Sequence, residues 1–135
     1  MKKTLFALSL TMLTALPAVA GNAAPMAPAA GDYKQVSTLV PLPEFIPGLG
    51  SLFVDPTTLP AGPFAAYDRT GKLVSTIYMI PIADMQNEKA FNGLAVAGDN
   101  VHSVDMYYNA GHPGVDVPHY HVTVWHVDPQ SADLN

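Results

Sequence analysis

Five histidines are the residues of this sequence best suited to chemistry, and all five lie in its last third. They are His102, His112, His119, His121 and His126. Imidazole is the commonest side-chain ligand for zinc, copper, iron and nickel. Clustering of this kind therefore raises the expectation of a metal site, and the spacing decides which histidines can share one ion.

His119 and His121 are separated by one residue in the most β-prone segment of the chain, 119–127. Alternate residues of a strand project from the same face and lie about 7 Å apart along the chain. A third imidazole is expected from His112, which lies in the Gly-His-Pro-Gly loop just upstream and can fold back toward the strand. Asp116 in the same loop is a candidate carboxylate ligand, or an acceptor that fixes an imidazole tautomer.

The remaining two histidines are expected outside the site. His126 falls on the opposite face of its strand from His121, and His102 lies on a different strand. With imidazole ligands and no thiolate, Zn²⁺, Cu²⁺ and Ni²⁺ all suit the set. The sequence therefore predicts a divalent metal held by His112, His119 and His121.

Other interpretations of the same residues stay open. A histidine on a strand can simply hydrogen-bond a carbonyl group. A His-x-His pair also begins the metal site of cupin-like enzymes, but such a site needs a later glutamate and a distant histidine, and no glutamate follows Glu88. An open coordination position would permit hydrolytic or oxygen chemistry. Because no residue pattern identifies a reaction, we expect a non-catalytic protein.

Aromatic side chains adjoin the histidines and suggest two further roles. They are Tyr107, Tyr108, Tyr120 and Trp125. They could line the pocket of a small-ligand-binding module, but Tyr and Trp are also common in cores and subunit interfaces. A domain of about 100 residues has a limited core, and 49% of the chain is hydrophobic, so burial between subunits is attractive. A homo-oligomer with a stress- or envelope-related role is therefore predicted.

Composition excludes several classes of protein. The chain has 135 residues, which fits one domain, and a formal net charge of −5, which argues against nucleic-acid binding. The absence of cysteine excludes disulfides, thiol nucleophiles and iron–sulfur clusters. No P-loop, dinucleotide-binding glycine pattern or G-x-S-x-G motif is present.

The N-terminus has the layout of a cleavable signal peptide. Lys2 and Lys3 precede an uncharged apolar segment, and Ala18 and Ala20 supply small residues before a cut after Ala20. The apolar segment is shorter than the roughly 20 residues that span a bilayer. We expect a periplasmic or secreted protein with a signal peptide at 1–20, a tether rich in Ala, Pro and Gly at 21–32, and no membrane span after cleavage.

The single domain, 33–135, is predicted to be a mostly-β sandwich or barrel with six or seven strands and one short helix. Strands are predicted at 36–39, 52–54, 64–67, 73–80, 94–97, 101–108 and 119–127, and the helix at 83–91. Turn residues predict two hairpins, one joining 64–67 to 73–80 and the other joining 94–97 to 101–108. The apolar character of both faces of 73–80 predicts a central strand.

Three segments carry a resemblance to known proteins: Pro47–Gly50, the run from Asp55 to Pro81, and GHPGVDVPHYHVTVWHV from Gly111 to Val127. They resemble a family of exported bacterial proteins classed as a domain of unknown function. Relatives carry Pro-His-Phe-Asp-x-His-Phe-Tyr at the last motif, where this chain has His121 in place of the Asp. The resemblance implies a mostly-β, self-associating extracytoplasmic protein without an established activity.

Overall fold

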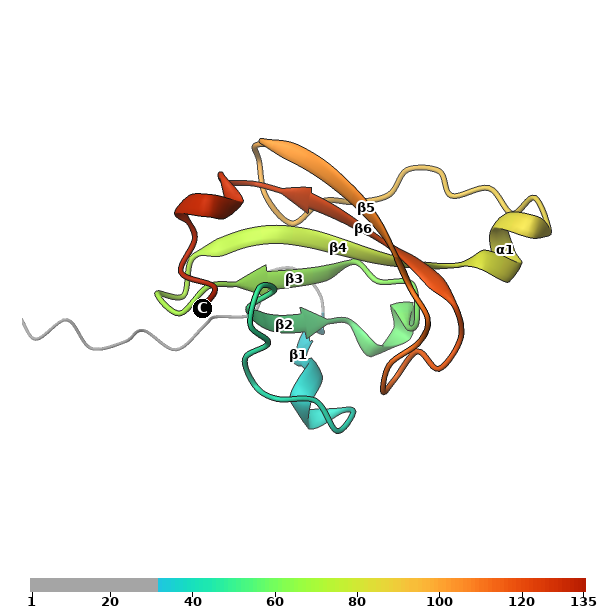
Figure 1. Ribbon diagram of the computed structural model, residues 1–135, viewed down its shortest axis with the longest axis horizontal. Coiled ribbons are helices and arrows are strands. Elements are labelled where there is room, and N and C mark those ends of the chain that lie inside the picture. Colours follow the sequence, from blue (N-terminus) through green and yellow to red (C-terminus); the bar gives the residue numbers. More distant parts are fainter. Residues whose placement is uncertain (1–31) are drawn as a thin grey trace, which may run out of the picture.

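The computed structural model describes residues 32–135, which form a six-stranded antiparallel sheet in the order β1-β2-β3-β4-β6-β5 (Figure 1). The strands are β1 (Lys34–Gln35), β2 (Ser51–Val54), β3 (Phe64–Tyr67), β4 (Leu73–Pro81), β5 (Ser103–Asn109) and β6 (His119–Trp125), and the α-helix is α1 (Ile82–Gln86). Short 3-10 turns lie at Val36–Thr38, Pro56–Thr58 and Pro129–Ser131. The predicted signal peptide and all but the last residue of the predicted tether lie outside the described residues.

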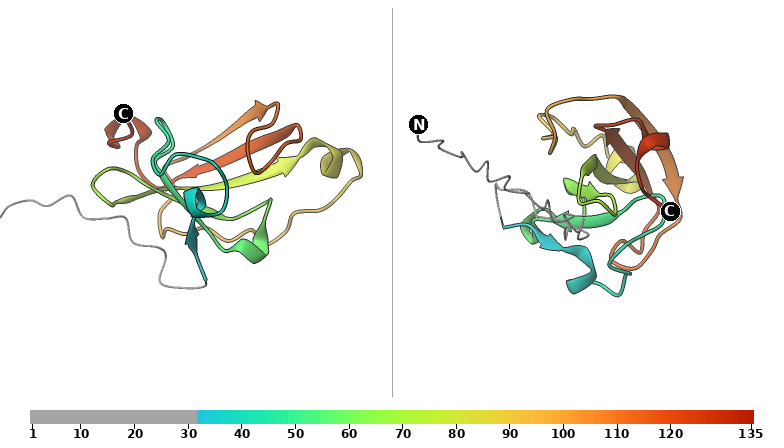
Figure 2. Two further views of the ribbon diagram at one scale, coloured as in Figure 1. Left: turned by 90° about the horizontal axis from the view of Figure 1, so that it is seen from below. Right: turned by 90° about the vertical axis from the view of Figure 1, so that its left-hand side faces the viewer.

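A mostly-β fold with six strands and one short helix is confirmed, but the architecture differs from the two that were predicted. Figure 2 shows one strongly curved sheet, and its edge strands β1 and β5 do not pair with each other within residues 32–135. No second sheet covers the core there. The proline-rich segment between β1 and β2 packs its apolar side chains, among them Val40 and Ile46, against the sheet instead. Frequent prolines prevent that segment from forming strands.

The predicted hairpin of β3 and β4 is confirmed, and so is the central position of β4. The turn between the two strands is held by Asp68, whose carboxylate accepts hydrogen bonds from the backbone N–H groups of Thr70 at 2.9 Å and Lys72 at 3.0 Å. β4 pairs with β3 on one side and with β6 on the other. Its residues from Val74 to Ile80 are all buried. An apolar run on both faces thus correctly predicted a fully covered strand.

The predicted hairpin of 94–97 with 101–108 is wrong. Segment 94–97 is not a strand, and β5 pairs with β6. Instead, the Ala97 N–H donates to Thr76 Oγ1 at 2.8 Å, and the Tyr78 hydroxyl donates to the Ala95 carbonyl. Two polar side chains on β4 therefore hold this segment across the sheet, where it covers β4 without joining the ladder.

Two other predicted elements are shorter or of another type. The helix predicted over 83–91 is confirmed only as α1, because the chain leaves the helix at Asn87 and Glu88 takes a positive φ of 58°. The strand predicted at 36–39 is a 3-10 turn with Val36 buried in the core. Within residues 32–135, no helix is long and apolar enough to cross a membrane.

The β4–β6–β5 ladder has two unlike faces. We call the face that carries His119, His121, Thr123 and Trp125 of β6 the front face, and the face that carries Tyr120, Val122 and Val124 the back face. Every β6 residue of the front face is buried, and every β6 residue of the back face is partly exposed. On the front face the Trp125 indole N–H donates to the Asp105 carboxylate of β5 at 2.8 Å.

Candidate metal centre

β6 brings His119 and His121 together on the front face, as the spacing predicts. Their imidazole rings are stacked, with centroids 4.9 Å apart and planes 24° from parallel. Both are buried, His119 completely and His121 to 3% exposure. In the strand register His121 lies between Met79 of β4 and Tyr107 of β5. The pair is therefore held on both sides by neighbouring strands.

A tight turn brings His112 to the same place, as predicted. The backbone N–H of His112 donates to the carbonyl of Val115 at 3.0 Å, and the N–H of Val115 donates back at 2.9 Å. Between them lie Pro113 and Gly114, and Gly114 has a φ of 91°. Proline followed by glycine with positive φ is the sequence of a type II turn. Val115 is buried in the core, so it anchors the loop that carries His112.

The three imidazoles converge through their Nε2 atoms. His121 Nε2 lies 3.0 Å from His119 Nε2 and 3.3 Å from His112 Nε2. One ligand atom of each residue lies within 4.8 Å of the other two. Tetrahedral ligands at the usual zinc–nitrogen distance of about 2.0–2.1 Å would lie about 3.3–3.4 Å apart. The cluster therefore has the spacing of a three-histidine metal site, and it could hold a metal ion.

Hydrogen bonds on the opposite edges of the rings fix the tautomers of two of these histidines. His119 Nδ1 lies 2.7 Å from the Val117 carbonyl oxygen, and His112 Nδ1 lies 3.0 Å from the Pro113 carbonyl oxygen. A carbonyl can only accept, so in the neutral form of each ring, which is the form that binds a metal, the proton is on Nδ1. The Nε2 atoms of His119 and His112 then present lone pairs toward His121, which is the arrangement of metal-ligating histidines.

The third imidazole, His121, cannot satisfy both neighbours with its own proton. A neutral ring has one N–H group, so its Nε2 can donate to His119 or to His112 but not to both. The remaining lone pair would face another nitrogen atom in a region sheltered from water, which is costly. A cation among the three Nε2 atoms would satisfy every lone pair at once.

Tyr107 completes the surroundings of His121. Its hydroxyl lies 2.9 Å from His121 Nδ1, and the two rings are 4.9 Å apart. When a metal occupies Nε2, His121 Nδ1–H donates to this hydroxyl, and all three rings then have an oxygen acceptor behind them. Burial raises the pKa of Tyr107, so the hydroxyl stays protonated at neutral pH.

Burial also acts on His121, whose pKa it lowers to about 4, with a further contribution from the neighbouring His119 and His112. The ring is therefore neutral at physiological pH, which is the form that ligates metals. Within residues 32–135 no carboxylate or cysteine joins these histidines in the cluster. A metal bound here would thus keep an open coordination position, as catalytic zinc sites do.

The other candidate residues lie elsewhere. Asp116 is exposed and is not part of the cluster, so its predicted role as a carboxylate ligand finds no support. His126 lies behind the sheet, as predicted, where it contacts Thr76 Oγ1 at 2.8 Å and the Asn100 carbonyl. His102 is exposed, and its Nδ1 lies 3.2 Å from the hydroxyl oxygen of Ser103. Two of the five histidines are therefore hydrogen-bonding residues outside the site.

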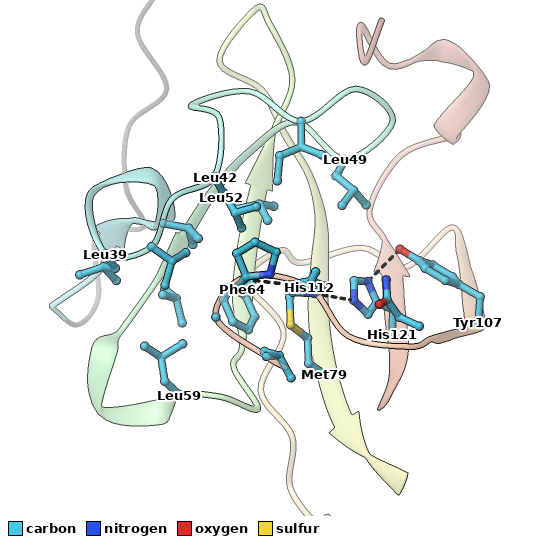
Figure 3. Close-up of a pocket in the computed structure, with 18 residues that line it drawn as sticks. Leu39, Leu42, Leu49, Leu52, Leu59, Phe64, Met79, Tyr107, His112 and His121 are labelled. Atoms are coloured by element: carbon cyan, nitrogen blue, oxygen red, sulfur yellow. Dashed lines mark hydrogen bonds between the residues drawn. The ribbon is translucent and has the colours of Figure 1, made fainter. Parts of the chain in front are cut away.

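An apolar pocket of about 260 Å³ adjoins the cluster, and His112 and His121 form part of its wall. Figure 3 shows Tyr107 and His121 at one side of this pocket and Leu39 and Leu59 at the other. Most of the remaining wall is aliphatic or aromatic, with Leu42, Leu49, Leu52, Phe64 and Met79 among its residues. The three-histidine cluster thus lies at the edge of a hydrophobic cavity and not on an open surface.

Sequence reasoning missed two parts of this site. Tyr107 was expected only as a wall or interface residue, but it faces His121 because β5 and β6 pair in the register that puts them opposite each other. The pocket wall supplied by the proline-rich segment was also missed. The alternation of Tyr107 and Tyr108 along β5 was an available signal, but only the pairing with β6 shows which of the two faces the histidines.

Comparison with known proteins shows that the chain is similar to a protein of unknown function. No protein-family model matches it, so the predicted family and its motif are not confirmed, and no curated protein matches it. Among solved structures, hypothetical protein TTHB210 from Thermus thermophilus matches at 41% sequence identity with a TM-score of 0.58. The match covers 64% of this chain and 85% of that chain.

Proposed function

Because the chain belongs to the same family as hypothetical protein TTHB210, whose name gives no activity, we propose a function from its own residues: it binds one divalent metal ion. The ligands are His112, His119 and His121. The observation that carries this proposal is that His121 Nε2 lies 3.0 Å from His119 Nε2 and 3.3 Å from His112 Nε2, with one ligand atom of each residue within 4.8 Å of the other two. Carbonyl oxygens behind two of the rings direct their lone pairs inward.

Zinc is the ion that this ligand set suits best. Three neutral imidazoles with an open fourth position form a familiar set of catalytic zinc ligands, and zinc imposes no other geometry. Cu²⁺ and Ni²⁺ also accept imidazole ligands. We therefore propose a site that binds borderline-soft divalent ions, and Zn²⁺ is the first ion to test.

The test is native mass spectrometry of the tag-free protein, before and after chelation and after addition of Zn²⁺, Cu²⁺ or Ni²⁺. We expect one ion per chain, removed by the chelator and restored by Zn²⁺. His119→Ala is expected to abolish this stoichiometric binding. His102→Ala is the matched control, because His102 is exposed and lies outside the cluster. A chain that binds no stoichiometric ion, or equal binding by both variants, would overturn the proposal.

A second candidate function is self-association through the back face of β5 and β6. The side chains of Val104, Met106 and Tyr108 are 55–59% exposed on this face, although β5 is the edge of the sheet. The one carboxylate on β5, that of Asp105, points to the front face, where it binds Trp125. Edge strands are usually protected by charges, so an edge strand whose back face is uncharged and apolar supports association with a second copy of the chain through that face.

Light scattering after size-exclusion chromatography tests this second candidate. The wild-type protein is expected to form an oligomer, and Met106→Lys is expected to shift it toward the monomer because a charge would be buried. Met85→Lys, at an exposed methionine on α1, is the control. A monomeric wild-type protein, or an oligomer that Met106→Lys leaves unchanged, would contradict self-association through this face.

The predicted signal peptide supports an extracytoplasmic location for both activities. Fractionation of cells that express the full chain tests this proposal. The protein is expected in the periplasmic or secreted fraction, with an N-terminus at Gly21. Recovery of the uncleaved chain from the cytoplasm would contradict it.

A further inference from the structure

The pocket beside the histidine cluster has one polar side and a long apolar wall. Its polar side chains come from β5, from β6 and from the loop between them, and they are those of Tyr107, Asn109, His112 and His121. No carboxylate, lysine or arginine lines it within the part of the chain that the structure describes. A pocket of this kind selects ligands by shape and by one polar end.

A metal at the cluster would make the polar side of this pocket cationic. Three neutral imidazoles leave the full charge of a divalent ion uncompensated, so the open position favours an anionic oxygen donor. Because His112 and His121 line the pocket, a ligand bound to that ion would have its remaining atoms next to the apolar wall. The two features together define a ligand with a charged head and a hydrophobic chain.

We propose that this pocket binds a small amphipathic carboxylate, with its head group on the metal and its hydrocarbon chain directed toward Leu39 and Leu59. This inference rests on the proposed metal centre. The volume of about 260 Å³ is enough for a chain of about eight groups the size of a water molecule, at roughly 30 Å³ each. The part of a longer chain beyond this length would extend past Leu39 and Leu59 into water, and a short acid such as acetate would leave most of the wall uncovered.

The side of the pocket away from the histidines supports access by such a chain. Leu39 and Leu59 are both exposed, although their side chains line the cavity. Exposed leucines at the border of an apolar cavity let a hydrocarbon chain pass from water without crossing a polar surface. The fully buried residue of the cluster, His119, does not line the pocket, so the cavity reaches the cluster from the side of His112 and His121.

Isothermal titration calorimetry with straight-chain acids from acetate to octanoate tests the inference on the full-length protein. The protein is used once loaded with zinc, verified by mass spectrometry, and once after chelation. For the zinc-loaded form we expect affinity to rise about fourfold for each added methylene, because each one buries apolar surface. The rise should stop when the cavity is full. The chelated form is expected to bind octanoate at least tenfold more weakly.

Leu39→Trp provides a second test, because the larger ring would fill the exposed side of the pocket. It is expected to weaken octanoate binding at least tenfold while leaving acetate binding and zinc stoichiometry unchanged. Leu94→Trp is the control, since Leu94 is similarly exposed and does not line the pocket.

The outcomes separate this inference from the metal centre. If the protein binds no zinc, both the proposed metal centre and the proposed carboxylate ligand are wrong. If zinc binds but affinity does not depend on chain length, or octanoate binds equally with and without zinc, the ligand proposal alone is wrong. Equal octanoate binding by Leu39→Trp and Leu94→Trp would also overturn it.

Discussion

The two faces of the β5–β6 ladder invert the usual distribution of polar and apolar side chains. On the front face, His121 is buried between Met79 and Tyr107. On the back face, one residue away along each strand, Met106 is 59% exposed and its partner Val122 is only partly covered. The same backbone ladder therefore buries an ionisable ring on one side and leaves apolar side chains in contact with solvent on the other.

This inversion indicates that neither face is explained by folding alone. A buried imidazole costs free energy unless its polar atoms have partners, and here two buried imidazoles lie beside a third that is partly buried. An exposed apolar face on an edge strand does not stabilise an isolated chain, and it favours association with another chain. The front face is thus suited to a bound ion and the back face to a protein surface.

The largest expected effect is that of metal on the stability of the front face. At a zinc concentration about 1,000 times the dissociation constant, the free energy of unfolding should increase by about 4 kcal/mol, because only the folded chain assembles the three ligands. His119→Ala should show no comparable increase. Urea denaturation with and without zinc measures both. A wild-type protein that zinc leaves unchanged would show that the buried histidines serve hydrogen bonding alone.

Acid is expected to weaken the metal-free front face. Folding lowers the pKa of His121 from its ordinary value of 6.5 to about 4, with His119, His112 and Tyr107 as the titratable groups around it. Between those two values the unfolded chain binds a proton that the folded chain does not, so stability is lost as the pH falls from 6.5 toward 4. The loss should reach roughly 1–3 kcal/mol.

Urea denaturation of the metal-free protein at about pH 7 and about pH 4.5 measures this loss in the free energy of unfolding. The two pH values enclose most of the range over which the loss is expected. His121→Asn serves as the comparison, because it removes the titrating ring and should flatten the dependence. A similar slope in both proteins would assign the acid sensitivity to other groups.

Two adjacent tyrosines allow the faces to be compared with the same substitution. Tyr107→Phe removes the hydroxyl that contacts His121 Nδ1, and zinc affinity should fall by roughly 10- to 100-fold, as for other groups that orient metal ligands. Tyr108→Phe removes a hydroxyl from the back face, where the ring packs on Tyr120, and should leave affinity unchanged. A competition assay with a zinc-chelating dye measures both. Equal affinities would show that Tyr107 does not position His121.

The smallest expected effect lies on the back face. Met106→Ala should change the free energy of unfolding of the isolated chain by less than about 0.5 kcal/mol, because its side chain is largely exposed. Ile77→Ala, at a buried position on the front face of β4, should cost about 2–5 kcal/mol. Urea denaturation at low protein concentration measures both, and a large effect of Met106→Ala there would show that its face is already covered within the chain.

The sequence predicted the clustering of the three histidines better than it predicted the sheet around them. His119 and His121 could be placed on one face because strand alternation is a local property, and the position of His112 in the Gly-His-Pro-Gly loop correctly predicted that it folds back toward the strand. Strand pairing is not local. The alternation of Tyr107 and Tyr108 gave no sign of which ring would lie opposite His121, since that depends on the β5–β6 register.

The errors in the fold have the same origin. Segment 94–97 has the composition of a strand. Segment 101–108 is the nearest other predicted strand along the chain, so the sequence predicted a hairpin between the two. Its actual partners are Thr76 and Tyr78, which lie well before it in the sequence and hold it through side chains. A composition that suits a strand equally suits an extended segment lying across a sheet, and only the three-dimensional contacts distinguish the two.

Trp125 gives the protein a built-in optical reporter. It is the one tryptophan in the chain, it lies on the same strand face as His119 and His121, and its indole is held by Asp105. It follows His121 along the strand at a distance of about 13 Å. Its fluorescence should therefore be quenched by a paramagnetic ion such as Cu²⁺ at the cluster and not by Zn²⁺. The arrival of the metal can thus be followed in real time on the unlabelled protein.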